Sequence, residues 1–160
     1  MITKFLPEFK VFEVNNLTGL RNGHIAAQMK ADATIIGNKE YVENGIIMGL
    51  NADGTLGTYD SAKHAIPFVH YTEEILTWIN ELKYFACPVE DGVVYPRGIA
   101  LYVGDTFTTN NYDGEIEGDG YAKVVGGVLT LQAGAEGAIF KATKSTLPTG
   151  ELAYEFLYIG

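Results

Sequence analysis

The chain has 160 residues, of which 47% are hydrophobic and 19% charged, and its formal net charge is −9 at pH 7. This length corresponds to one domain, which can bury enough surface to fold without a disulfide or a metal. The composition excludes wholesale disorder. The negative charge argues against binding to a nucleic-acid backbone or to an anionic membrane surface.

The single cysteine, Cys87, excludes an intrachain disulfide and is interpreted as a small buried apolar residue. The first residues lack an apolar core of signal-peptide length, and no segment is long enough to span a membrane. We therefore expect a protein that is made and kept in a reducing cytoplasm, unless it leaves inside a larger assembly.

Residues 1–20 are predicted to be an N-terminal arm, and residues 21–160 a single β-rich domain. Pro7 and the pair Asn15-Asn16 interrupt the arm, and only Val11–Val14 has the pattern of a short strand. The arm carries many apolar groups. Packing on its own domain is favoured over packing on a neighbouring subunit.

Short strands separated by turn signals are predicted along most of the chain. Asn51 to Gly54 predicts the turn of one hairpin, and Gly126-Gly127 predicts a type I′ turn in the clearest hairpin. The terminal strand is apolar on both faces and should lie inside a sheet. The predicted strands cover residues 24–29, 46–50, 55–58, 68–71, 84–87, 93–95, 99–103, 106–109, 121–125, 128–131, 138–143 and 152–159.

One amphipathic α-helix is predicted over residues 72–83. Thr72 is a suitable N-cap, and Glu73 and Glu74 lie in the first turn, where the helix dipole favours acids. Apolar residues recur on one face at the spacing of a helix. These residues are Ile75, Leu76, Trp78, Ile79 and Leu82.

The most informative run is YPRGIALYVGDTFTTN, from Tyr95 to Asn110, which predicts two strands and the corner between them. Ile99, Leu101 and Val103 alternate with smaller or polar residues and should form one buried face. Gly104-Asp105 is a turn signal. The fold class is therefore mostly β: a small β-barrel or a β-sandwich of short antiparallel strands, with one helix and an N-terminal arm. The pattern does not discriminate between barrel and sandwich.

No pattern of reactive residues stands out. Asp113, Glu115 and Glu117 match the first positions of a calcium loop, but Val124 stands where the bidentate Glu is needed. The three histidines and Cys87 lack the spacing of a zinc site. There is no nucleophile elbow and no phosphate loop, and nothing selects one carboxylate pair for glycoside hydrolysis. We predict no catalytic, cofactor-binding or metal-binding residues.

Several segments resemble the small structural proteins of tailed-phage virions, of the head-decoration or capsid-associated type. They are GHIAAQ (residues 23–28), ENGIIMGL (43–50), HYTEEI (70–75), the run from Tyr95 to Asn110, and LPTGELAYEF (147–156). The resemblance implies a non-enzymatic protein, present in many copies on the capsid surface and made in the host cytoplasm. Its partners would be the major capsid protein or other virion proteins, and self-association is left open.

Candidate contact residues come from the arm and from aromatic turns, where large side chains can anchor a protein partner. They are Phe5, Phe9, Phe12, Tyr95, Arg97 and Tyr112. Tyr59 is a further turn aromatic expected to be exposed. Three alternatives remain: a tail or neck component, a carbohydrate-binding module whose tyrosines stack on sugars, and a small enzyme built from scattered carboxylates.

Overall fold

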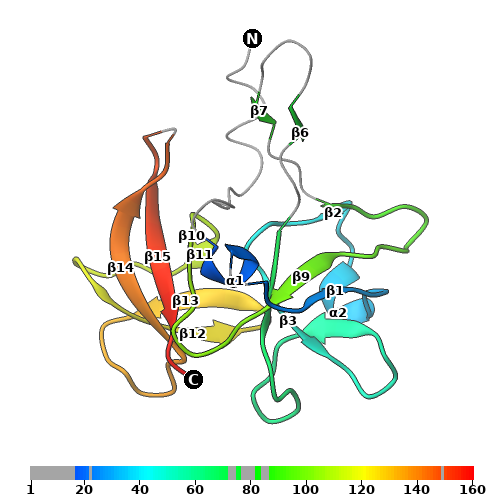
Figure 1. Cartoon of the computed structure of the whole chain (residues 1–160), viewed down its shortest axis with the longest axis horizontal. Coiled ribbons are helices and arrows are strands. Elements are labelled where there is room, and N and C mark those ends of the chain that lie inside the picture. The colour runs from blue at the N-terminus through cyan, green and yellow to red at the C-terminus, as the bar shows by residue number, and fades with distance from the viewer. Residues whose placement is uncertain (1–16, 22, 72–74, 77–81, 84–86, 149) are drawn as a thin grey trace.

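Two curled β-sheets that pack against each other form the body of the fold (Figure 1). The computed structural model describes residues 17–21, 23–71, 75–76, 82–83, 87–148 and 150–160. The predicted fold class, mostly β with short and largely antiparallel strands, is confirmed. Neither described helix has the length and apolarity that crossing a membrane requires.

The first sheet has five antiparallel strands and curls back on itself. Its order is β1 (Ala26–Gln28), β9 (Arg97–Ala100), β5 (Phe68–His70), β3 (Ile47–Leu50) and β4 (Leu56–Thr58). The segment after β1 reaches across to β4, where Leu56 N–H donates to the carbonyl of Lys30 and Asp32 N–H donates to the carbonyl of Leu56. These two bonds tie the ends of the sheet together.

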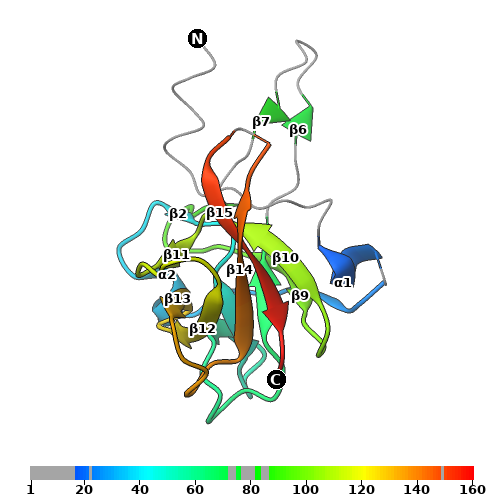
Figure 2. The same ribbon diagram turned by 90° about the vertical axis from the view of Figure 1, so that its left-hand side faces the viewer.

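The second sheet has six strands and faces the viewer in Figure 2. Its order is β10 (Thr106–Thr109), β15 (Leu152–Tyr158), β14 (Phe140–Thr146), β12 (Gly120–Val125), β13 (Val128–Gln132) and β11 (Tyr112–Asp113). The edge strands β10 and β11 are separated by residues 110–111 alone, so this sheet must also curl. As predicted, β15 lies inside the sheet, between β10 and β14.

Smaller elements complete the described chain. They are α1 (Thr18–Arg21), α2 (Ala33–Ile36), and the strand pairs β2 (Tyr41–Val42) with β8 (Cys87–Pro88) and β6 (Ile75–Leu76) with β7 (Leu82–Lys83). Asp32 caps α2 by accepting from Thr34 N–H.

The central strands of the first sheet are buried on both faces. Ile47, Val69 and Ile99 point into a large core shared with the second sheet. Their neighbours Met48, Phe68 and Ala100 point into a separate core inside the first sheet. This arrangement explains the continuous apolar run over residues 46–50, since a strand covered on both sides need not alternate.

Three phenylalanines occupy the centre of the shared core. Phe107, Phe140 and Phe156 are fully buried, and their ring centroids lie 5.6–6.3 Å apart. They come from three neighbouring strands of the second sheet, β10, β15 and β14, so this cluster joins long-range elements. Contacts of this kind contribute beyond the area they bury.

The prediction of a helix over residues 72–83 is wrong for the residues that the structure describes there. Ile75 pairs with Lys83 and Leu76 with Leu82 in an antiparallel ladder. The remaining residues of the stretch lie outside the described ones. The apolar spacing of the stretch fits a helix, but its β-branched and aromatic residues favour strands. Spacing over twelve residues alone therefore did not discriminate between a helix and a strand pair.

Both predicted hairpins are confirmed. Met48 pairs with Thr58 across the turn at residues 51–54. Val125 pairs with Val128, and Gly126 and Gly127 have φ values of 56° and 80°, as a type I′ turn requires. The predicted strand Val11–Val14 lies outside the described residues, as does the arm up to residue 16. Leu17 is fully buried in the shared core.

Candidate functional site

The corner between β9 and β10 passes the chain from the first sheet to the second, as the sequence predicts. Asp105 N–H donates to the carbonyl of Tyr102, and Gly104 has a φ of 99° between them. This turn needs glycine at its third position because other residues are strained at positive φ. Leu101 is buried on one side of the turn, whereas Val103 is 71% exposed at its tip.

The carboxylate of Asp105 is turned into the protein. It accepts hydrogen bonds from Tyr102 N–H (2.8 Å) and from the Thr18 hydroxyl (3.2 Å), and that hydroxyl accepts from Thr106 N–H (2.8 Å). Nδ1 of His24 lies 2.8 Å from Oδ2 of Asp105 without meeting the geometry of a hydrogen bond. Asp105 therefore joins α1, the corner and the segment before β1.

Exposed apolar side chains surround this corner. Tyr102 and Val103 lie on the turn itself, and continuing the ladder between β5 and β9 places Ile66 opposite Tyr102. Gly104 N–H donates to the carbonyl of Tyr158, which brings Ile159 alongside. We call Ile66, Tyr102, Val103 and Ile159 the corner patch.

The corner patch is uncharged although the protein is acidic. Residues 65–67, 101–104 and 158–160, which form it, contain no Asp, Glu, Lys or Arg. Asp105, the residue after Gly104, is 4% exposed, and its carboxylate is hydrogen-bonded inside the protein. An exposed apolar surface without charged side chains is a candidate protein-binding site.

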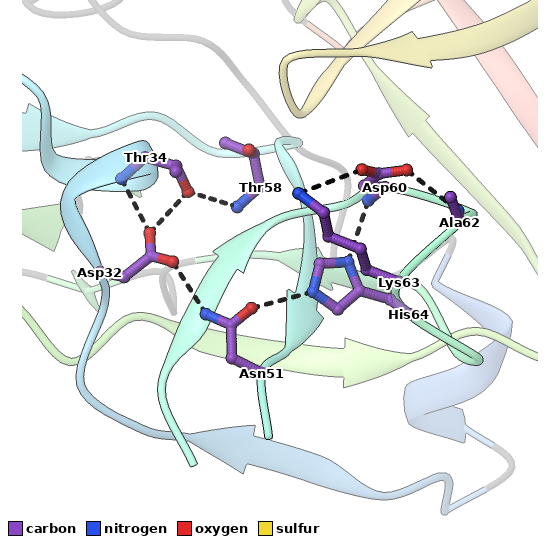
Figure 3. Close-up of polar contacts among 8 residues, drawn as sticks. All are labelled: Asp32, Thr34, Asn51, Thr58, Asp60, Ala62, Lys63 and His64. Atoms are coloured by element: carbon purple, nitrogen blue, oxygen red, sulfur yellow. Dashed lines mark hydrogen bonds and ion pairs between the residues drawn. The ribbon is translucent and has the colours of Figure 1, made fainter. Parts of the chain in front are cut away.

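A second polar cluster lies on the hairpin of β3 and β4 (Figure 3). Asn51 donates to Asp32 (2.8 Å) and accepts from Nε2 of His64 (3.0 Å). Nδ1 of His64 accepts from Asp60 N–H, which assigns the proton to Nε2. Burial acts to raise the pKa of Asp32, but hydrogen bonds from Thr34 and Asn51 outweigh it and hold that pKa below its ordinary value.

The side chains of this cluster are engaged with neighbouring groups. Both ring nitrogens of His64 are engaged, and Asp32 accepts from Thr34 and Asn51. Its role is to hold the loop at residues 59–64 over the hairpin. The hairpin offers room because two glycines, Gly49 and Gly57, face each other across the strands.

Replacing Gly49 with alanine is expected to lower the free energy of unfolding by about 2 kcal/mol, because overpacking forces neighbours aside. A Cβ at this position would lie 2.2 Å from Cγ of His64. Gly134→Ala is the matched control, since its Cβ would meet nothing within 4 Å. Chemical denaturation of both variants measures the difference, and equal stabilities would contradict this account of the cluster.

His70 is a buried histidine of the first sheet. Its Nδ1 lies 2.6 Å from the carbonyl of Arg97 and donates to it. Burial lowers the pKa of His70 to about 4, against the opposing effect of backbone groups at Arg97 and Val42. The ring is therefore neutral in the folded protein at neutral pH.

Acid should destabilise the fold through His70. The pKa is 6.5 in the unfolded chain and about 4 in the folded protein. The unfolded chain thus binds more protons between these values, and stability falls as the pH drops through this window. From pH 7 to pH 5 the expected loss is about 2 kcal/mol. Chemical denaturation at pH 7 and pH 5 should show that His70→Asn loses less unfolding free energy than the native protein, by about 2 kcal/mol. Equal losses in the two proteins would show that His70 does not cause this pH dependence.

An open groove of about 430 Å³ lies between β4 and the hairpin of β12 and β13. Asp60 is the one carboxylate among its lining residues, and its side chain accepts from Ala62 N–H and contacts Lys63. Tyr59 also lines it; burial raises the pKa of its hydroxyl, with Tyr158 and Asp60 adding to the effect. The groove does not bring together a pair of acids.

The structure separates the predicted contact residues. Tyr95 is 54% exposed just before β9, and Arg97 is half-buried at the start of that strand. Tyr112 is half-buried, with its ring edge-on to Tyr154 at a centroid distance of 5.1 Å, and burial raises its pKa. Phe5, Phe9 and Phe12 lie outside the described residues.

Two expectations about exposure are wrong. Tyr59 was expected to be exposed but is buried in the shared core. Val103 was expected to share a buried face with Ile99 and Leu101, but β9 ends at Ala100 and the turn that follows directs Val103 outward. The sequence analysis did not predict the corner patch, for which the uncharged run Leu101–Gly104 is the available signal.

The other predicted features are placed as follows. Cys87 is half-buried and packs against the core of the first sheet, and burial raises the pKa of its thiol. Within the described part of the chain, no group of three or more His, Cys, Asp or Glu residues could hold a metal ion. Asp113, Glu115 and Glu117 are exposed around the end of β11.

Comparison of the chain with models of known protein families, with curated proteins and with solved structures finds no match.

Proposed function

We propose that the protein is a non-enzymatic structural protein of a tailed-phage virion, which binds the capsid lattice in many copies and stabilises or decorates the head. The observation that carries the proposal is the corner patch, an uncharged apolar surface on an acidic protein. The phage context rests on the resemblance of the sequence segments, and the patch supplies the surface through which such a protein would bind.

The physical character of the patch suits binding to a lattice. A single small apolar contact gives weak affinity, but many copies on a repeating surface can reinforce a shell together. The net charge of −9 disfavours contacts between copies outside their specific interfaces. The hydrogen bonds of Asp105 hold the patch in one conformation, which limits the entropy lost on binding.

A carbohydrate-binding module receives less support. Stacking on sugars requires exposed aromatic faces, and of the three turn tyrosines only Tyr95 is largely exposed. Tyr59 is buried, and the ring of Tyr112 packs against Tyr154. The groove beside Asp60 lacks a second carboxylate among its lining residues, so it offers no acid pair for an enzyme.

Particles carrying a tagged copy test the proposal directly. Imaging should place the tag on the head surface in a regular array, whereas absence from particles would refute a virion role. Density confined to the neck or tail would move the protein to another part of the virion and refute lattice binding.

Deleting residues 1–14 is expected to leave a folded domain and to weaken assembly on particles. The arm is apolar, and the deletion spares Leu17, which is buried in the core. Occupancy per particle can be compared by quantitative gel analysis of purified particles, with circular dichroism as the control for folding. Equal occupancy with and without the arm would count against a role for it.

A further inference from the structure

The strand β1 forms an edge of the first sheet over Ala26–Gln28, before residues 30–32 bond to β4. It pairs with β9 on one side, and no described strand pairs with its other side. Successive residues of β1 direct their backbone N–H and carbonyl groups alternately toward β9 and away from it. Ala100 N–H donates to the carbonyl of Ile25, so residues 25 and 27 bond to β9.

Ala26 and Gln28 therefore direct their backbone groups away from β9. The hydrogen bonds on the other side of β9 are consistent with this. Arg97 and Leu101 bond to residues at the ends of β5, which leaves Gly98 and Ala100 to bond to β1. Both Ala26 and Gln28 are exposed. Two N–H groups and two carbonyls thus point outward, and no described residue bonds to them.

The edge strands β4 and β10 are each bonded in part by another segment. On β4, the segment at residues 30–32 bonds to Leu56, and the Thr34 hydroxyl accepts from Thr58 N–H. On β10, the Thr18 hydroxyl accepts from Thr106 N–H. The edge of β1 has no such cover.

The edge also lacks the features that prevent strand pairing. Residues 25–29, Ile-Ala-Ala-Gln-Met, include no charged residue and no proline, and the β1–β9 register has no bulge. Ile25 and Met29, at the two ends, are 65% and 41% exposed. Small residues between them permit close approach of another backbone.

We infer that a second copy of this chain pairs its own β1 with this edge, antiparallel across a twofold axis at Ala27. Ala26 of one copy then lies opposite Gln28 of the other, and each pair exchanges N–H and carbonyl bonds. Ile25 lies opposite Met29 at both ends. The two sheets become one continuous sheet through an isologous interface.

The local charge at β1 permits a second copy as the occupant despite the net charge of each chain. Each copy carries a net charge of −9, so contact between acidic faces is repelled. The segment from His24 to Ala31 contains no Asp or Glu and one lysine, which makes it a place where two copies can meet without opposing carboxylates. The inference does not depend on the proposed function.

Sedimentation equilibrium of the full chain tests the inference. The 17.4 kDa chain should show a concentration-dependent monomer–dimer equilibrium. Ala26→Pro should raise the dimer dissociation constant at least about tenfold, because it removes an outward N–H and leaves the bonds to β9 intact. Thermal unfolding of the monomer checks that the variant folds.

A charge exchange tests the register independently of proline. Ile25→Lys should weaken the dimer, and adding Met29→Glu should restore it, because the lysine of one copy then faces the glutamate of the other. Adding Met29→Lys should not restore it.

Three outcomes would overturn the inference. One is a chain that remains monomeric up to millimolar concentration. Another is a dimer unaffected by these edge variants. The third is a dimer abolished by deleting residues 1–14 but insensitive to the edge variants, which would assign the contact to the arm.

Discussion

Replacing Asp105 with alanine is expected to lower the free energy of unfolding by about 3 kcal/mol, the range found when one partner of a buried charged contact is removed. The carboxylate is almost fully buried, and it accepts from Tyr102 N–H and from the Thr18 hydroxyl. Alanine would leave both donors without this acceptor. The corner, α1 and the segment at His24 would lose the side chain that contacts all three.

Two further variants separate the parts of this effect. Asp105→Asn keeps an acceptor oxygen of similar shape and should destabilise less than alanine. Asp53→Ala removes an exposed carboxylate that bonds only within its own turn, to Thr55, and should change stability far less. Denaturant titration of the three proteins measures the differences. A stable Asp105→Ala protein would show that the corner is held by packing alone.

The hairpins and the corner were predictable because their signals are local. A pair of glycines suffices to predict the turn between β12 and β13, since both positions need positive φ. Gly104-Asp105 likewise marks the end of a strand without reference to the rest of the fold. The strand β15 is long and apolar on both faces, which is the pattern of a strand inside a sheet.

The remaining features depend on contacts that sequence spacing does not contain. The stretch over residues 72–83 has apolar positions that fit a helix, yet its described residues pair as strands. Tyr59 is next to a polar loop but is buried, because the second sheet covers it. The continuous apolar run over residues 46–50 became interpretable only once both cores were located.

The position of the candidate site was predictable from local sequence, but its exposed residues were not. The run from Tyr95 to Asn110, the most informative part of the sequence, contains the corner. The exposure of Val103 was not predicted, because strict alternation placed it with Ile99 inside the fold. Val103 points outward because β9 ends at Ala100. The last bond to the neighbouring segment is the one that Leu101 N–H donates to the carbonyl of Pro67.

Replacing Val103 with aspartate is expected to weaken binding to capsids about a hundredfold, equivalent to about 2.7 kcal/mol. A carboxylate buried against an apolar partner loses its hydration without gaining a counter-charge. Val103 is the most exposed residue of the corner patch, so the folded protein should tolerate the change. Thermal unfolding would verify that tolerance.

Val125 provides a matched control. It is 54% exposed at the end of β12 and is not part of the corner patch, and Val125→Asp introduces the same charge. Any loss caused by net charge alone would therefore appear in both variants, whereas a loss specific to the corner would appear only at Val103.

The decisive measurement is the binding of purified protein to phage heads assembled without it, followed by co-sedimentation over a concentration series. We expect saturable binding of the native protein and of Val125→Asp with similar midpoints, and a midpoint about a hundredfold higher for Val103→Asp. Equal midpoints for the two aspartate variants, or no saturable binding of the native protein, would contradict a protein that acts through an uncharged surface at this corner.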